Sequence, residues 1–190
     1  RLLSSASHDY IHRTPDDALA ELHQLAQLGT RLRAANIAPV ERCGLFRGQA
    51  YVAMENIEGT SLLAWQQAER RPVVEILERY IQAANGLAYA HEHRISHGDF
   101  NAQHVVVDGS AVYVANFGVG AAPGPDSDDV RPFADQYSFC VALQAALDSA
   151  EPLSGVSTRL SDALNRGKSP ARRFATMRAL LVELERAKLE

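Results

Sequence analysis

A polar loop followed by two β-branched segments constrains the fold of this chain more than any other feature. Residues 97–99 read His-Gly-Asp and open the loop, and residues 105–107 are three consecutive valines. A second β-branched segment begins at residue 112 and ends in Asn-Phe-Gly at residues 116–118. Because β-branched residues favour strands, we expect the loop to lead directly into two short strands.

The first part of the chain predicts one helix and a hairpin. Leucines repeat at three- or four-residue intervals from Leu19 to Leu32, which indicates an amphipathic helix over residues 15–35. Residues 40–46 and 50–56 favour two strands joined by a short turn.

The rest of the chain predicts mainly helices, so the fold class is α+β with strands early and helices late. Residues 121–132 are rich in Pro, Gly and acids and are expected to form a flexible loop. The next segment is nearly all apolar and is expected to be a buried helix, and residues 167–170 are expected to break the chain. The predicted helices are a short one from Leu62, then 73–93, 133–147, a weaker one at 153–164, and a last one capped by Thr176.

Length and composition narrow the class of protein. A chain of 190 residues with 46% hydrophobic residues predicts one folded domain, or one domain of two lobes. The net charge of −4 and the lack of a long basic run argue against nucleic acid as a partner. Cys43 and Cys140 are far apart and form no disulfide or zinc pattern. No apolar run is long enough for a membrane span and no signal-peptide core is evident, so we expect a cytoplasmic protein without a membrane segment.

The loop and its two strands resemble the catalytic loop and metal-binding loop of the protein kinase superfamily, written H-R-D-x-x-x-x-N and D-F-G. Residues 134–143 resemble the central helix of that family in its bacterial Ser/Thr kinase form, and residues 171–174 its closing segment. The resemblance implies a protein kinase-like fold, with a mostly helical C-lobe over residues 58–190. Residues 1–57 would form a truncated N-lobe of one helix plus a β-hairpin.

The resemblance also implies roles for particular residues. Asp99 matches the base that accepts the proton of the substrate hydroxyl, although a lone Asp in a loop is more often a turn former. Asp135 matches an acid that holds the backbone of the catalytic loop, and Glu21 matches the helix glutamate that pairs with the ATP-binding lysine. The positions matching the nucleotide site are Met54, Glu55, Ile57, Val106 and Asn116. Leu25, His97 and Phe117 match residues that align the two lobes, a role for which core packing is sufficient.

Several positions depart from the family pattern. His104 and Asn116 occupy the metal-ligand positions, where the family has Asn and Asp, and Gly98 replaces an Arg. Magnesium prefers hard oxygen ligands, usually including a carboxylate, and imidazole is a poor substitute. No Gly-x-Gly-x-x-Gly motif is present, and no lysine precedes Lys168, so Glu21 lacks a lysine partner within this sequence. We therefore expect no bound cofactor, with ATP and magnesium disfavoured, and no metal.

These departures favour a pseudokinase that serves as a binding or regulatory module for a protein partner, such as another kinase or signalling protein. An active or weakly active Ser/Thr protein kinase that uses Asp99 is an alternative. Small-molecule phosphotransferases of the aminoglycoside and choline kinase type also use His-Gly-Asp, which gives a second enzymatic alternative. Zinc is a third, because five possible ligands lie within fourteen residues: His91, His93, His97, Asp99 and His104. His97 is expected to turn inward, and surface and core histidines without metal are the favoured interpretation.

Overall fold

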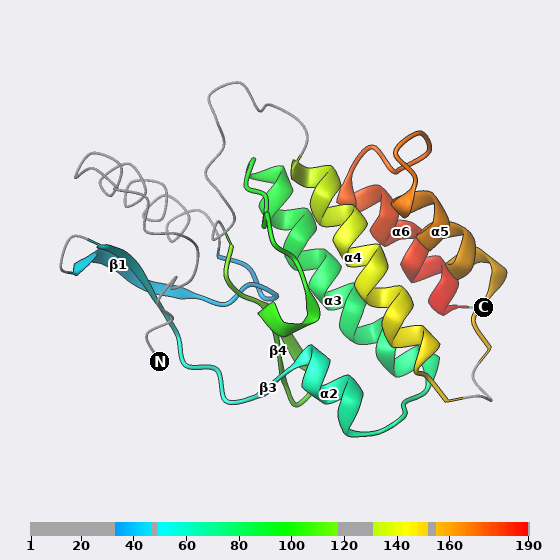
Figure 1. The fold of residues 1–190 in the computed structure, drawn as a ribbon, viewed down its shortest axis with the longest axis horizontal. Helices are drawn as coiled ribbons and strands as arrows, with labels where there is room; N and C mark the ends of the chain where they lie inside the picture. The colour runs from blue at the N-terminus through cyan, green and yellow to red at the C-terminus, as the bar shows by residue number, and fades with distance from the viewer. Residues whose placement is uncertain (1–32, 47–48, 118–130, 152–154, 190) are drawn as a thin grey trace.

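The computed structural model describes residues 33–46, 49–117, 131–151 and 155–189 (Figure 1). Glu21, Leu25 and most of the predicted first helix lie outside these residues, as does most of the loop predicted at 121–132. The last residues of that predicted helix, 33–35, are not helical.

A turn at residues 35–36 takes the place of the predicted helix end. Ile37 forms a parallel bridge with Val114, and the side chain of Asn36 donates a hydrogen bond to the carbonyl of Val112 at 3.0 Å. Pairing with a distant strand therefore overrides the local helical pattern.

The predicted hairpin is present. Strand β1 (Val40–Phe46) pairs antiparallel with β2 (Gln49–Met54), and in Figure 1 the hairpin lies to one side of the helices. The second strand ends at Met54 rather than at residue 56, because Met54 pairs with Val40, the first residue of β1. The predicted lobe boundary after residue 57 falls between this hairpin and the next strand, and it stays a prediction.

A second sheet carries the candidate site. It consists of β3 (Thr60–Ser61), β4 (Val105–Asp108) and β5 (Ala111–Val114), antiparallel and in that order. The two strands predicted after the polar loop are thus β4 and β5. Strand β5 ends at Val114 rather than at residue 118, because Asn116 has a left-handed φ of 63° that cannot continue a strand.

Helices form the larger part of the described chain. They are α2 (Leu62–Ala68), α3 (Val73–Glu92), α4 (Arg131–Asp148), α5 (Thr158–Lys168) and α6 (Met177–Lys188), with a 3-10 turn at Ala102–His104. Ser61, Ser157 and Thr176 each accept a hydrogen bond at a helix start, so side-chain capping sets where these helices begin. None of the described helices combines the length and the apolar character needed to cross a bilayer.

Helix α5 differs most from its prediction. It begins at Thr158 instead of 153, because Ser157 caps it, and it continues through Gly167 to Lys168. Gly167 does not break the helix, because it packs against α4, where an added Cβ would collide with the sulfur of Cys140. The glycine is therefore a packing residue rather than a turn residue.

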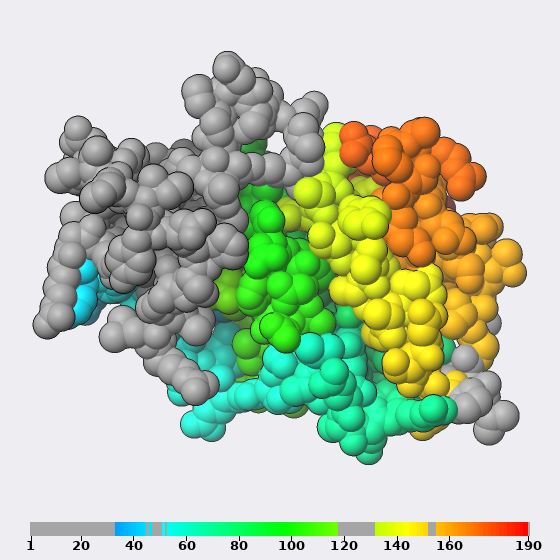
Figure 2. Space-filling model, viewed as in Figure 1, coloured from blue at the N-terminus to red at the C-terminus, as the bar shows by residue number. Residues whose placement is uncertain are grey.

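Helix α3 lies at the centre and packs against β5, α4 and α6 (Figure 1). Helix α4 was expected to be buried, and this prediction is only partly correct. Phe139, Cys140 and Leu143 are buried, whereas Tyr137 and Val141 are 53% and 42% exposed. The described chain packs α3 and α5 against α4, which leaves a third face of α4 on the surface shown in Figure 2.

Candidate active site

Asp135 holds the backbone of the polar loop. This carboxylate lies near the start of α4 and is only 1% exposed. Its Oδ2 atom accepts hydrogen bonds from the amide of His97 at 2.7 Å and from Nε2 of His91 at 2.8 Å, and its Oδ1 atom accepts one from the amide of Gly98 at 2.8 Å. Charge-assisted bonds of this kind are short and strong, so the buried charge fixes where the loop begins.

His97 connects the loop to the residues that follow β5. It is fully buried, and its Nε2 atom donates to the carbonyl of Ala115 at 2.8 Å while Nδ1 accepts from the amide of Asp99 at 3.3 Å. Burial lowers the pKa of His97 below its ordinary value of 6.5, although the nearby charge of Asp135 opposes this shift. A neutral ring with its proton on Nε2 satisfies both hydrogen bonds.

Aromatic rings surround His97. The ring of Phe117 lies 4.9 Å from it and that of Phe100 5.7 Å, measured between ring centroids. Phe117 and His97 are both buried and pack together. This contact is expected both of residues that align two lobes and of ordinary core residues. Leu25, the third member of the predicted set, lies outside the described residues.

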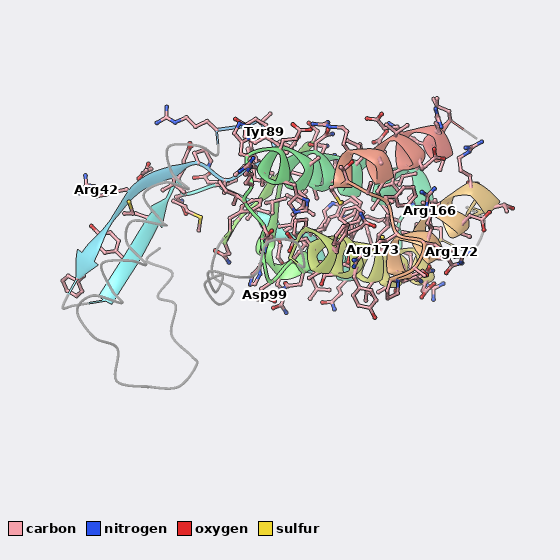
Figure 3. The ribbon with its side chains drawn as sticks, turned by 90° about the horizontal axis from the view of Figure 1, so that it is seen from above. Arg42, Tyr89, Asp99, Arg166, Arg172 and Arg173 are labelled. Carbon is pink, nitrogen blue, oxygen red and sulfur yellow. The ribbon has the colours of Figure 1, made fainter. Side chains whose placement is uncertain are left out.

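Asp99 is held by its backbone and exposed through its side chain. The carbonyl of Asp99 accepts from Nδ1 of His104 at 2.9 Å and from the side-chain amide of Asn101 at 3.3 Å. Its carboxylate is 62% exposed, with Oδ2 3.7 Å from Nδ1 of His104. Figure 3 shows Asp99 at the surface between the hairpin and α4. The carboxylate is thus free to accept a proton from a bound hydroxyl group.

The structure brings one metal-ligand position, His104, to Asp99, and brings the residue before the other, Ala115, to His104. The side chain of His104 bonds to the carbonyl of Asp99, and the carbonyl of His104 accepts from the amide of Ala115 at 2.8 Å. Asn116 follows directly, half-buried. The ring of His104 presents nitrogen, not oxygen, at its position. Asn116 contributes a neutral amide, so Asp99 provides the only carboxylate among these three side chains.

Val106 and the residues predicted to contact adenine lie around the start of β3. Val106 is half-buried and pairs with Ser61 on one side and Tyr113 on the other. Met54 and Ile57 are half-buried and Glu55 is exposed, in the segment that leads from β2 to β3. The segment therefore leads into β3, the strand that pairs with β4 at Val106.

Gly59 was not predicted as a site residue. A Cβ atom at Gly59 would lie 3.0 Å from Cγ1 of Val106 and would collide with the carbonyl of Val107. Only glycine lets the backbone approach β4 this closely. Its position just before a short strand was the available signal.

His91 and Gln136 were also missed as positioning residues. His91 was considered only as a zinc ligand, yet it binds Asp135. Gln136 is buried and makes two bonds to the backbone of Phe174, accepting from its amide at 3.0 Å and donating to its carbonyl at 3.2 Å. Polar residues on the inner side of an apolar helix, as Gln136 is on α4, were the signal that could have identified such links.

The histidines of the region are engaged separately. His93 stacks on Tyr89 at 4.2 Å between ring centroids, whereas His91 binds Asp135 and His97 binds Ala115. Within the residues that the structure describes, no three His, Cys, Asp or Glu side chains are grouped so that they could hold a metal ion.

The sequence model of the family described as protein tyrosine and serine/threonine kinase matches residues 9–136, more than half of the chain. The chain belongs to the protein kinase family. The matched residues include 97–99 and 116–118, the two segments whose sequence resembles the loops of this family.

Bacterial Ser/Thr protein kinases are among the similar proteins. Serine/threonine-protein kinase PknI of Mycobacterium tuberculosis is 27% identical over 152 residues, which cover 73% of this chain and 26% of that protein. PknD of the same species is 29% identical over 158 residues, covering 70% of this chain and 24% of that protein. CBL-interacting protein kinase 4 of Oryza sativa subsp. japonica is 31% identical over 105 residues, covering 53% and 23%. The chain thus spans about a quarter of the length of these kinases.

A solved structure confirms the predicted fold class. The kinase domain of M. tuberculosis PknI, crystallised as a double mutant, superposes with a TM-score of 0.75 at 22% sequence identity. The match covers 98% of this chain and 94% of that chain. The kinase-like fold, mainly helical with a small strand-containing N-lobe part, is therefore shared across almost the full extent of both.

Proposed function

We propose that this protein kinase-like domain is a pseudokinase, a binding or regulatory module with little or no phosphoryl transfer. The observation that carries the proposal is the lack of a negatively charged side chain at the two metal-ligand positions. The two side chains in the metal-ligand positions are an imidazole, His104, and a neutral amide, Asn116.

The physical argument concerns the magnesium ion that phosphoryl transfer needs. This chemistry depends on positioning and on neutralising the phosphate charge with metal held by oxygen ligands. Replacing a carboxylate by an amide about 4 Å from the ion removes roughly 4 kcal/mol of attraction at an effective dielectric of about 20, as an upper bound. His104 offers nitrogen, which magnesium binds poorly, and Asn116 offers a neutral amide in place of a carboxylate.

The buried framework supports a role as a binding module. Asp135, His91 and His97 form a hydrogen-bonded unit that uses no nucleotide or metal. The kinase-like fold can therefore be kept when phosphoryl transfer is lost. The protein that would bind its surface is a partner such as another kinase or signalling protein.

A weakly active Ser/Thr kinase is the second candidate. Asp99 has an exposed carboxylate on a loop whose backbone is held, which is what a proton acceptor requires. The match to a family of protein kinases favours a protein over a small molecule as its substrate.

Two measurements on the purified chain test the proposal. We expect magnesium–ATP to leave the thermal midpoint unchanged and no label to transfer from radiolabelled ATP to a protein acceptor. Restoring the ligands with His104→Asn and Asn116→Asp should produce a magnesium-dependent stabilisation of about 1.4 kcal/mol at ligand tenfold above its Kd.

Label transfer by the unchanged protein that is lost in Asp99→Ala would refute the pseudokinase and establish the weak kinase. Asp108→Ala is the matched control, because Asp108 is an exposed acid at the end of β4 outside the site. It should leave any transfer intact.

A further inference from the structure

A hollow on the outer side of α5 lies apart from the candidate active site. A cavity of about 560 Å³ is lined by Asp162, Asn165, Arg166 and Arg172, between α5 and the segment that joins it to α6. A second cavity of about 440 Å³ also has Asp162 and Arg166 in its lining, and the two neighbouring cavities are together named here the α5 hollow. Figure 3 shows Arg166 and Arg172 near one another, at the end of the molecule far from the hairpin.

Arg166 is positioned by the protein itself. Its guanidinium lies 4.1 Å above the ring of Phe174, and its Nε atom donates to the carbonyl of Arg172 at 2.8 Å. Phe174 is in turn held through its backbone by Gln136. A side chain that is already oriented loses little freedom when a ligand binds, and this raises affinity.

Arg166 stays out of an ion pair that its sequence position favours. Asp162 lies four residues earlier on α5, the spacing at which acid and base normally pair on a helix. Within the described chain no ion pair or hydrogen bond joins the two side chains, because Arg166 turns toward Phe174. Its two terminal nitrogens therefore remain available to a ligand.

Arg172, like Arg166, has no acidic partner among the described residues. Its guanidinium has no ion pair or hydrogen bond to any residue that the structure describes, although it lines the cavity. Four cations on α5 and α6 are paired instead: Arg159 and Arg186 with Glu183, Arg178 with Glu92, and Lys188 with Glu78. Among the described residues, Lys168 and Arg173 have no ion pair, but neither lines the hollow. The hollow thus keeps two guanidinium groups unneutralised on a surface where ion pairing is common.

This chemistry suits a phosphate monoester. Guanidinium forks bind phosphate through two parallel hydrogen bonds, and two of them match a dianion better than a single carboxylate charge. Asn165 adds an amide donor, and Asp162 places one negative charge at the edge, which favours a basic residue beside the phosphate. We infer that the α5 hollow binds a phosphorylated serine or threonine side chain of a protein partner.

The proposed function contributes only the class of partner to this inference, a phosphorylated signalling protein. The site itself uses no residue of the polar loop. A failure of phosphopeptide binding would leave the nucleotide experiments above unaffected, and the reverse also holds.

Fluorescence anisotropy with labelled peptides tests the site on the full chain. The probe is an alanine-rich peptide that carries one phosphothreonine next to a lysine, compared with the same peptide bearing threonine. We expect the phosphorylated peptide to bind at least about 10-fold more tightly, because charge-assisted hydrogen bonds from the arginines to the phosphate contribute at least that much to the affinity. Equal affinities for both forms would overturn the proposal.

Three variants assign the effect to the α5 hollow. Arg172→Gln should weaken binding about 10-fold without lowering the thermal midpoint, because its side chain bonds to no described residue. Asp162→Asn should strengthen binding, since it removes the repelling charge, and this opposite sign separates a binding effect from misfolding. Arg70→Gln removes an exposed arginine between α2 and α3 and should change affinity less than about twofold.

Three outcomes would contradict the inference. Equal losses in Arg70→Gln and Arg172→Gln would indicate non-specific attraction by net charge. Inorganic phosphate competing as well as the unlabelled phosphopeptide would indicate an adventitious ion only. Arg172-dependent binding to phosphatidic acid vesicles without phosphopeptide binding would assign the hollow to a membrane surface instead.

Discussion

Asp135 and Asp99 serve the same loop and are held in opposite ways. Asp135 is 1% exposed and accepts bonds from two backbone amides and a histidine. The side chain of Asp99 is 62% exposed, and among the described residues its carboxylate approaches His104 alone, at 3.7 Å. Asp135, which shapes the loop, is thus buried and has its hydrogen-bonding capacity used by the protein. Asp99, which would act as the proton acceptor, is exposed and keeps most of this capacity. Substitutions at the chemical positions can therefore accumulate without loss of the fold.

The largest expected effect comes from removing the buried acid. Asp135→Ala should lower the free energy of unfolding by about 3–5 kcal/mol, because two amides and His91 lose their acceptor in a water-excluded site. Urea unfolding at pH 7.5 measures this loss. A change below about 1 kcal/mol would mean that the loop does not depend on Asp135, since surface substitutions rarely exceed about 0.5 kcal/mol.

A smaller effect is expected from pH, through His97. Because the pKa of His97 is lowered in the fold, the unfolded chain takes up its proton first as pH falls below 6.5. The free energy of unfolding should therefore be fully maintained above this pH and fall by up to about 1.4 kcal/mol per pH unit below it. Asp135 and Asp99 face His97 and limit the fall, because their charges raise its pKa, whereas the nearby His104 lowers this pKa and adds to the fall.

Urea unfolding at several pH values between 5 and 7.5 measures this slope. His97→Asn should remove it, whereas His93→Gln, a change at an exposed histidine, should keep it. A slope that persists in His97→Asn would assign the pH dependence to other groups.

The smallest effect on stability is expected from a substitution of Asp99, the exposed acid of the comparison. Asp99→Asn should change the free energy of unfolding by less than about 0.5 kcal/mol, because the carboxylate is exposed and its backbone bonds remain. Thermal and urea unfolding measure this. A loss close to that of Asp135→Ala would show that the two acids are not separate in role.

Periodicity predicted those elements whose stability is local. The long helix α3 follows from its apolar repeat, and the final helix follows from its apolar repeat and the cap of Thr176. The errors occur where distant residues decide the structure. Residues 33–35, the end of the predicted helix, are not helical, because the following Asn36 and Ile37 bond to β5. Gly167 stays helical because it packs against Cys140.

The candidate site was predictable to the extent that it rests on linear motifs. Residues 97–99 and 116–118 stand out along the chain. The structure brings His104, and Ala115 just before Asn116, to the loop of Asp99. Gly59 and Gln136 were not identified, because their importance lies in one close approach and one pair of hydrogen bonds across the fold. The local signals, a glycine before a short strand and a polar residue on an apolar helix, do not reveal which distant residues are contacted.

The seam between α4 and α5 has a practical consequence for chemical labelling. Burial raises the pKa of the Cys140 thiol to about 12, and Gly167 allows the neighbouring helix to cover the sulfur. Cys43, on β1, is only partly covered. A thiol-specific dye added to the native protein would thus mark the hairpin at one position, and modification of the second cysteine would report separation of the two helices.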